Sequence, residues 1–138
     1  MSATFYLAGS SHECRMVSNY VERLTRAGLV CAYDWTADVE RNRAIGRVDS
    51  DLTSDERRAI AVAELNAVTK CDLFWLLCPE SPSRGCWGEL CARLVAKGPR
   101  GGRSLVSGRH AQSIFCELAD EKFDSHEAAY EWAVEEFR

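Results

Sequence analysis

The chain has 138 residues, of which 46% are apolar and 28% are charged, and its formal net charge is −4. This size and composition are typical of one globular domain with one hydrophobic core, which we place at residues 1–138. The negative charge argues against a nucleic-acid polymer as partner, because binding a phosphate backbone requires a basic surface. A single nucleotide held in a small pocket is compatible with this charge.

The amino terminus shows no targeting pattern. Residues 1–5 lack the charged start and the long apolar segment of a signal peptide. No apolar run in the sequence reaches the length that a membrane span requires. We therefore expect a soluble, cytoplasmic protein with no membrane partner.

The seven cysteines are expected to be structural. No two of them form a C-x-x-C pair, and the three histidines do not complete a zinc-binding pattern with them. Most of them lie inside apolar runs, where cysteine behaves as a small hydrophobic residue. We predict no metal ion and no cofactor. The cysteines are Cys14, Cys31, Cys71, Cys78, Cys86, Cys91 and Cys116.

A β-α-β unit is predicted at the amino terminus. Residues 4–8 read as a short buried strand, residues 12–27 repeat apolar side chains at helical spacing, and residues 29–33 form a second strand. Gly28 stands where a glycine commonly ends a helix. Such a unit pairs its strands in parallel. The loop at residues 9–11 offers backbone N–H groups and hydroxyls to an anion.

Residues 34–51 have weak periodicity and form either a loop or a short helix. So long a connection often covers a site. Its Trp35 either stacks on a planar ligand or closes the edge of the core, and the sequence leaves both open. Thr53 and Glu56 then match a capping box, which predicts a helix to about residue 70. We expect its inward face to consist of Ile60, Ala61, Leu65 and Val68.

The stretch from residue 71 to residue 97 combines a strand, a loop and a helix. The apolar run 71–78 stops at a proline, a polar loop follows, and a helix then begins with Leu90, Leu94 and Val95 on one face. In an open parallel sheet, ligands bind at such a junction. This one contains Ser83 in the loop and Glu89 in what we expect to be the first helical turn.

The last third of the chain continues the alternation of strands and helices. Residues 104–106 form a fourth strand, and a polar loop then leads to a short helix that includes Cys116. Residues 122–123 form a fifth strand, and residues 124–127 match a second capping box before a final amphipathic helix. The alternation predicts a single-domain α/β architecture.

Three short motifs together resemble the nucleoside 2-deoxyribosyltransferase superfamily. They are Tyr6-Leu7-Ala8-Gly9-Ser10, Glu64 eight residues before Asp72, and Ser83-x-Gly85-x-x-x-Glu89-Leu90. The resemblance implies a flavodoxin-like (Rossmann-like) domain, a parallel sheet of about five strands flanked by helices.

The branch that the chain resembles most is that of the 2′-deoxynucleoside 5′-monophosphate N-glycosidases. In that branch, serines hold the 5′-phosphate, and the last of them comes from a neighbouring subunit, which implies a homodimer. Carried over to this chain, the phosphate- and substrate-binding residues are Gly9, Ser10, His12, Ser83, Gly85 and Ser113. Ser10 and Ser83 could equally be ordinary helix caps.

The chain departs from the family pattern at three positions. Glu64 stands where the family has aspartate, and Cys91 stands where a glycine is usual. His12 stands where the branch has arginine, so the phosphate lacks a bidentate partner there.

The resemblance implies roles for three residues in breaking an N-glycosidic bond. Glu89 would attack the anomeric carbon and form a covalent glycosyl-enzyme, and the helix dipole would favour its ionised form. Glu64 would protonate or orient the base, or position the sugar. Tyr6 would hydrogen-bond Glu89 or line the sugar pocket. Water would then release the sugar.

Three alternative functions remain open. The segment around Cys86-Trp87 and Glu89-Leu90 also resembles the catalytic helix of TIR domains that cleave NAD. The departures at Glu64 and His12 would also suit a silent protein that binds and sequesters a nucleotide. A nucleoside deoxyribosyltransferase is the third alternative, against which Ser83 counts, because transferases typically have aspartate there.

Overall fold

The computed structural model describes residues 2–138 of the chain. Its strands are β1 (Thr4–Ala8), β2 (Val30–Cys31), β3 (Leu73–Leu77), β4 (Arg103–Ser107) and β5 (Glu121–Phe123). Its α-helices are α1 (Cys14–Arg26), α2 (Trp35–Ala44), α3 (Ser54–Lys70), α4 (Gly85–Ala96) and α5 (His126–Phe137). Short 3₁₀ turns are η1 (Ser11–Glu13), η2 (Asp49–Asp51), η3 (His110–Gln112) and η4 (Ile114–Leu118).

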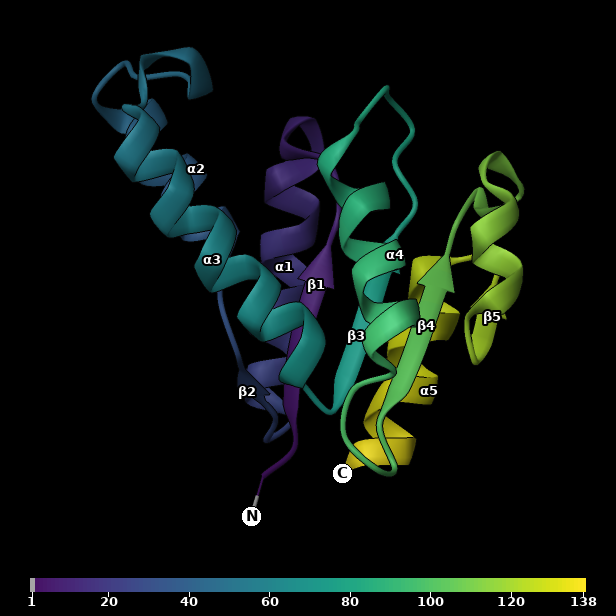
Figure 1. The fold of residues 1–138 in the computed structure, drawn as a ribbon. Helices are drawn as coiled ribbons and strands as arrows, with labels where there is room; N and C mark the ends of the chain where they lie inside the picture. The colour runs from purple at the N-terminus through teal and green to yellow at the C-terminus, as the bar shows by residue number, and fades with distance from the viewer. Residues whose placement is uncertain (1) are drawn as a thin grey trace.

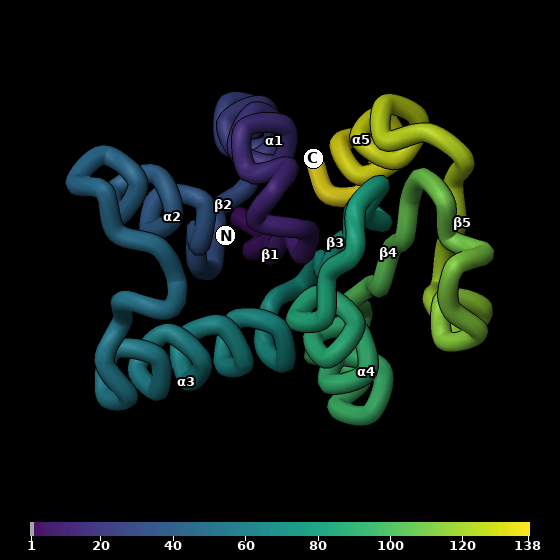
Figure 2. Tube along the Cα trace, turned by 90° about the horizontal axis from the view of Figure 1, so that it is seen from above, coloured from purple at the N-terminus to yellow at the C-terminus, as the bar shows by residue number. Residues whose placement is uncertain are grey.

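The five strands form one parallel sheet in the order β2-β1-β3-β4-β5 (Figure 1). Helices α1 and α5 cover one face of this sheet, and α3 and α4 cover the other (Figure 2). The predicted flavodoxin-like α/β fold is thus confirmed. Because β3 lies in the middle and is covered on both faces, all five of its residues are buried.

The first β-α-β unit agrees with the sequence prediction except at its second strand. β1 has the predicted bounds, and Gly28 has a φ of 102°, the left-handed conformation that ends α1. β2 is only two residues long, because it lies at the sheet edge and pairs with Thr4 and Phe5 alone. Residues 29–33 are therefore mostly connection rather than strand.

The connection that the sequence left open contains the helix α2. Asp34 caps it, because its carboxylate accepts hydrogen bonds from the backbone N–H of Thr36, at 3.0 Å, and from the Thr36 hydroxyl. Only Trp35 and Thr36 are buried, since the helix lies beyond the edge strand β2 (Figure 2). Of its other residues, Val39 is the hydrophobic one that packs against the core, and it is only partly buried, which explains the weak periodicity.

The capping box that begins α3 is confirmed, but its predicted inward face is partly wrong. The Thr53 hydroxyl accepts from the Glu56 N–H at 3.1 Å, and the Glu56 carboxylate accepts from the Thr53 N–H at 3.0 Å. Leu65 is 47% exposed, and Ala61 is exposed as well. The helix runs obliquely over the sheet (Figure 1), so its buried side turns toward Ala67 and Val68.

Helix α4 also turns a different side to the core than expected. Leu90 is buried as predicted, but Val95 is 84% exposed, and the other buried positions are Cys86 and Arg93. Because α4 begins at Gly85, Glu89 is its fifth residue and lies beyond the first turn. The prediction of a first-turn carboxylate is therefore wrong.

The residue that caps α5 lies one position after the predicted one. Ser125 caps this helix by accepting from the Ala128 N–H at 3.1 Å, so the predicted box starting at Asp124 is wrong by one residue. β5 has the expected place in the chain, with one additional residue.

The cysteines behave largely as predicted, since five of the seven are buried and burial raises the pKa of those thiols.

Arg93 is a buried cation that joins three elements. It is 2% exposed, and its guanidinium donates to the carbonyls of Val68 and Cys71 at 3.0 and 2.6 Å. It also lies 3.3 Å from the carbonyls of Asp72 and Arg103. A Cβ atom at Gly98, whose φ is 63°, would lie 2.3 Å from the guanidinium carbon, so glycine is required there.

A hydrogen-bonded chain on the other face of the sheet suits the neutral form of His126. The Trp75 indole N–H donates to the Ser107 hydroxyl at 2.8 Å, and this hydroxyl lies 2.7 Å from Nδ1 of His126. The indole N–H occupies one lone pair of the Ser107 oxygen, so the serine proton can be donated to Nδ1 of a neutral His126 ring. Burial lowers the pKa of His126 accordingly.

We expect His126 to make stability pH-dependent near neutrality. Its folded pKa lies below the ordinary value of about 6.5, so below that pH the unfolded chain binds the extra proton. The free energy of unfolding should therefore fall as the pH falls through this range. Urea denaturation across this pH range should show a shallower fall in His126→Asn, which keeps an acceptor but cannot titrate. Equal slopes in both proteins would contradict the assignment.

Across residues 2–138, none of the helices combines the length and apolar character that crossing a membrane would require.

Candidate functional site

A cavity of about 460 Å³ opens at the carboxyl ends of β1 and β3. The loop after β1 and the first turn of α4 form one end of it, and α2, η2 and α3 form the other. Its volume is within the range of small-ligand sites, and its position is where parallel sheets bind ligands. The connection at residues 34–51 covers it, as predicted from the length of that segment.

Two carboxyl groups from different helices line this cavity. Glu89 comes from α4, and Glu64 comes from α3, where it faces inward rather than toward solvent. Tyr6, at the centre of β1, is fully buried below them, and its hydroxyl donates a hydrogen bond to Oε2 of Glu89. The Tyr6 ring is held by stacking on Phe74, with the ring centroids 6.3 Å apart.

The environment of Glu89 favours its protonated form. Burial, together with the negative charge of Glu64, raises the pKa of Glu89 to about 8, against the opposing effect of the Tyr6 hydrogen bond. Burial also raises the pKa of Glu64. Our prediction that the helix dipole favours ionised Glu89 is therefore wrong, because this residue lies past the free N–H groups of the first turn. These raised pKa values favour a proton on the carboxyl pair at neutral pH.

Removing the charge of Glu64 should lower the pKa of Glu89. In Glu64→Gln we expect a fall of about one unit, because the repulsion between the two carboxylates disappears while the burial of Glu89 remains. Glu64→Asp, which keeps the charge, should retain most of the raised value. The measurement is a carbon-13 NMR titration of the glutamate side chains. An unchanged Glu89 pKa in Glu64→Gln would show that the two groups do not interact.

The opposite end of the cavity contains the residues that resemblance assigned to a phosphate. Gly9, Ser10, His12, Ser83 and Gly85 all line it. The Ser10 hydroxyl caps η1 by accepting from the His12 N–H at 3.2 Å. The Ser83 hydroxyl accepts from the Cys86 thiol at 3.5 Å, and its own proton can still be donated to a ligand.

Gly85 is not required for its backbone conformation. It begins α4 without a positive φ, and a Cβ atom there would meet nothing within 4 Å. The glycine leaves open space beside the cavity.

Two arginines at the cavity were missed in the sequence. Arg84, between Ser83 and Gly85, adds a cation at the end where His12 replaces the arginine of the resembled branch. Its position inside the motif was visible in the sequence and could have indicated it. Arg57 of α3 lines the other end, but its guanidinium donates to the carbonyl of Leu52 at 2.6 Å.

Ser113 does not line the cavity of its own chain. Its hydroxyl caps η4 by accepting from the Phe115 N–H at 3.2 Å. Gln112, the residue before Ser113, connects this loop to the loop after β3, since its side-chain amide donates to the carbonyl of Pro79 at 2.8 Å. Asp72 is structural, because its carboxylate accepts from the Thr4 N–H at 2.8 Å and holds the start of β1 against β3.

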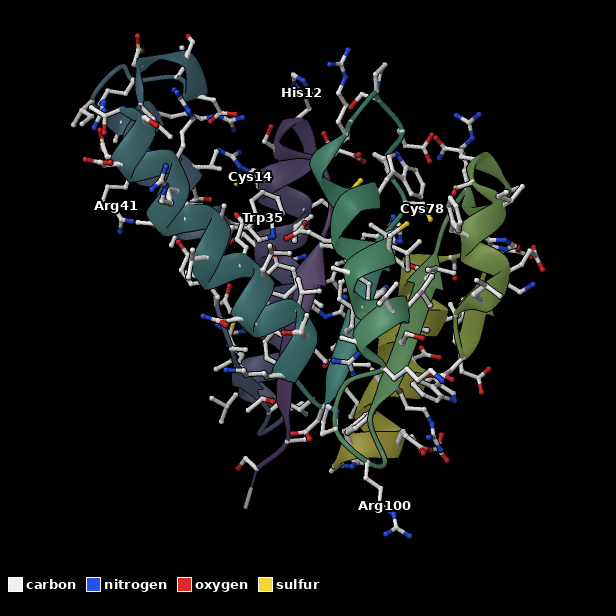
Figure 3. All side chains as sticks on the ribbon, in the orientation of Figure 1. His12, Cys14, Trp35, Arg41, Cys78 and Arg100 are labelled. Carbon is white, nitrogen blue, oxygen red and sulfur yellow. The ribbon has the colours of Figure 1, made fainter. Side chains whose placement is uncertain are left out.

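Trp35 combines the two positions that the sequence left open. It is 7% exposed and donates its indole N–H to the carbonyl of Leu7 at 2.6 Å, which closes the edge of the core. Its ring also forms part of the cavity wall. Figure 3 shows it below His12, which lies at the open top of the molecule.

Comparisons with known proteins do not identify this chain. A scan against protein-family models finds no match, and a search of curated proteins finds none either. Membership of the deoxyribosyltransferase superfamily therefore stays a prediction that depends on the three sequence motifs.

Proposed function

We propose that this protein is an N-glycosidase that cleaves the base–sugar bond of a nucleoside or deoxynucleoside 5′-monophosphate. The observation that supports this most is the arrangement of Tyr6, Glu89 and Glu64 at one cavity. A buried phenol holds one carboxyl group, and a second carboxyl from another helix faces it. Paired carboxyl groups are the usual means of cleaving glycosidic bonds.

Glu89 acts as the nucleophile in this proposal. An oxygen of its carboxylate bonds to C1′ of the sugar while the bond from C1′ to the base breaks, which gives a glycosyl ester. Water then attacks C1′ and releases the sugar phosphate and the Glu89 carboxylate. The Tyr6 hydroxyl stabilises negative charge on Glu89, since its hydrogen bond lowers the pKa of that group.

Glu64 acts as the general acid and base. A neutral base leaves more readily when it receives a proton, and the pair of carboxyl groups has one to give at neutral pH. In the reacting form this proton lies on Glu64 and the charge lies on Glu89. After the base has left, ionised Glu64 accepts a proton from the attacking water.

The phosphate is bound by the end of the cavity that Ser10 and Ser83 line. Both hydroxyls can donate to phosphate oxygens, and Arg84 and His12 add positive charge there. The backbone N–H groups at the start of α4 favour an anion at the same place.

The proposed working unit is a homodimer. Ser113 lies next to η4, whose Ile114, Phe115 and Leu118 are 81%, 47% and 66% exposed. A second copy of the chain that covers this apolar surface could bring Ser113 to its partner's cavity. Sedimentation is expected to give a dimer, and Phe115→Glu should give a monomer with weakened activity. A monomeric wild-type chain with full activity would contradict this.

The test of the proposed function is a chromatographic screen for free base. Common nucleosides, their 5′-monophosphates and NAD are incubated separately with the wild-type chain and with Glu89→Gln. Release from monophosphates but not from nucleosides is expected. Release of nicotinamide from NAD alone would favour a TIR-like enzyme, and transfer to an added second base would favour a transferase. Tight binding of intact nucleotide without any release would favour a silent binding protein.

A further inference from the structure

The end of the cavity opposite the phosphate-binding serines is acidic. Besides Glu64 of α3, its wall includes Asp38 from α2 and Asp49 from η2, and Glu89 of α4 lines the same cavity. The charges of Asp38 and Asp49 reach the carboxyl pair, because both raise the pKa of Glu64. Four carboxyl groups from four different elements therefore line this cavity.

The nearby arginines compensate this charge only in part. Arg41 pairs with Asp38, but its side chain is 68% exposed and lies outside this cavity. In Figure 3 it points away from the centre of the molecule. Arg57 is directed to the Leu52 carbonyl. A neutral base would leave the remaining negative charge of this wall uncompensated.

Trp35 provides a second feature of the cavity, where its ring lies beside Gly9. Its indole forms part of the wall and is held in place by the hydrogen bond to the Leu7 carbonyl. Tryptophan has the most favourable aromatic ring for attracting a cation, and its flat surface suits a planar one. The tryptophan and the carboxylates favour the same kind of ligand.

We propose that the base of the nucleotide substrate is positively charged, as in a pyridinium or an N7-alkylpurinium nucleotide. This inference rests on the proposed N-glycosidase function and narrows its substrate class. The carboxylates of Asp38 and Asp49 stabilise the charged ring, and Trp35 forms part of the same cavity wall. The serines at the other end bind the phosphate.

A cationic base also suits the protonation of the carboxyl pair. Its positive charge favours ionised Glu89, which is the form that attacks. As the bond between C1′ and the ring nitrogen breaks, the electron pair returns to that nitrogen, and the base leaves neutral without receiving a proton. Water then adds at C1′, and its proton passes through Glu64 to solvent. Each turnover releases one proton, whereas hydrolysis of a neutral nucleotide places that proton on the base.

The test compares guanosine 5′-monophosphate with its N7-methyl derivative, at a pH that keeps the methylated base cationic. Nicotinamide mononucleotide is a second cationic probe. A cationic base is intrinsically a better leaving group, so the decisive quantity is the change that Asp49→Asn makes in kcat/KM. This change should be a loss of about tenfold for the cationic nucleotides and clearly less for guanosine 5′-monophosphate. Asp55→Asn removes the same charge from α3 outside the cavity and should alter neither.

The outcomes separate this inference from the function on which it rests. A selective loss in Asp49→Asn, with one proton released per base, supports it. Equal losses for charged and neutral nucleotides, or preferred cleavage of the neutral one by the wild-type chain, would overturn the cationic base and leave the N-glycosidase function standing. No Glu89-dependent release from any 5′-monophosphate would overturn both.

Discussion

Replacing Glu89 with glutamine is expected to slow base release at least about a thousandfold. Glutamine has the same shape and still fits beside Tyr6, but its amide cannot form the glycosyl ester. Binding of nucleotide should persist, because the phosphate-binding serines are untouched. The measurement is single-turnover release of free base, with Glu131→Gln, an exposed glutamate on α5, as the matched control.

The loss of activity in Glu89→Gln should not come from unfolding. The fold raises the pKa of Glu89 from 4.5 to about 8, so across this range the folded chain binds a proton that the unfolded chain does not. This contribution to the free energy of unfolding therefore falls as the pH rises from 4.5 to about 8. Glu89→Gln lacks this pH-dependent decrease in the free energy of unfolding, so it should be at least as stable as wild type at pH 8. Activity within tenfold of wild type would remove Glu89 from the mechanism.

Replacing Arg93 with methionine should lower the free energy of unfolding by about 3 kcal/mol or more. The methionine chain fills much of the same volume, but the carbonyls of Val68 and Cys71 lose their donor. These carbonyls lie at the end of α3 and just after it, where no helical partner is available. Buried acceptors without partners are the source of the loss.

Urea denaturation at neutral pH measures the effect of Arg93→Met. Arg100→Met is the control, because this exposed arginine points away from the lower end of the molecule (Figure 3) and should change stability by less than about 0.5 kcal/mol. The loss of stability in Arg93→Lys should lie between the losses in Arg93→Met and Arg100→Met, since one ammonium group cannot reach every carbonyl. A loss for Arg93→Met no larger than that for Arg100→Met would contradict the role of the guanidinium.

The sequence predicts the order of strands and helices well, because that order depends on local patterns. An apolar strand such as residues 71–78 is bounded by turn residues, and Thr53 and Glu56 mark a helix start within four positions. The exposed faces of α3 and α4 were harder to predict. Leu65 and Val95 fit an apolar stripe, but the angle at which each helix crosses the sheet depends on packing that the sequence does not state.

The sequence predicts those features of the candidate site that follow from the topology of the sheet. It does not predict those that depend on which side chains surround a residue. Parallel strands end at the same edge of a sheet, so Ser10 and Ser83 line one cavity although they are far apart in the chain. The raised pKa of Glu89 was not predictable, because it comes from burial and from Glu64 on another helix. Asp38 and Asp49 belong to a segment without periodicity, and only the structure brings them to the cavity wall.

The most direct test of the account is to look for the sugar on Glu89. A nucleoside 5′-monophosphate with fluorine at C2′ slows the second step, because fluorine disfavours positive charge at C1′. After incubation and acid quenching, intact-protein mass spectrometry should show one added pentose phosphate group, and peptide mapping should place it on Glu89. Glu89→Gln should remain unmodified. Release of base with an unmodified wild-type protein, or a sugar attached to another residue, would contradict the account.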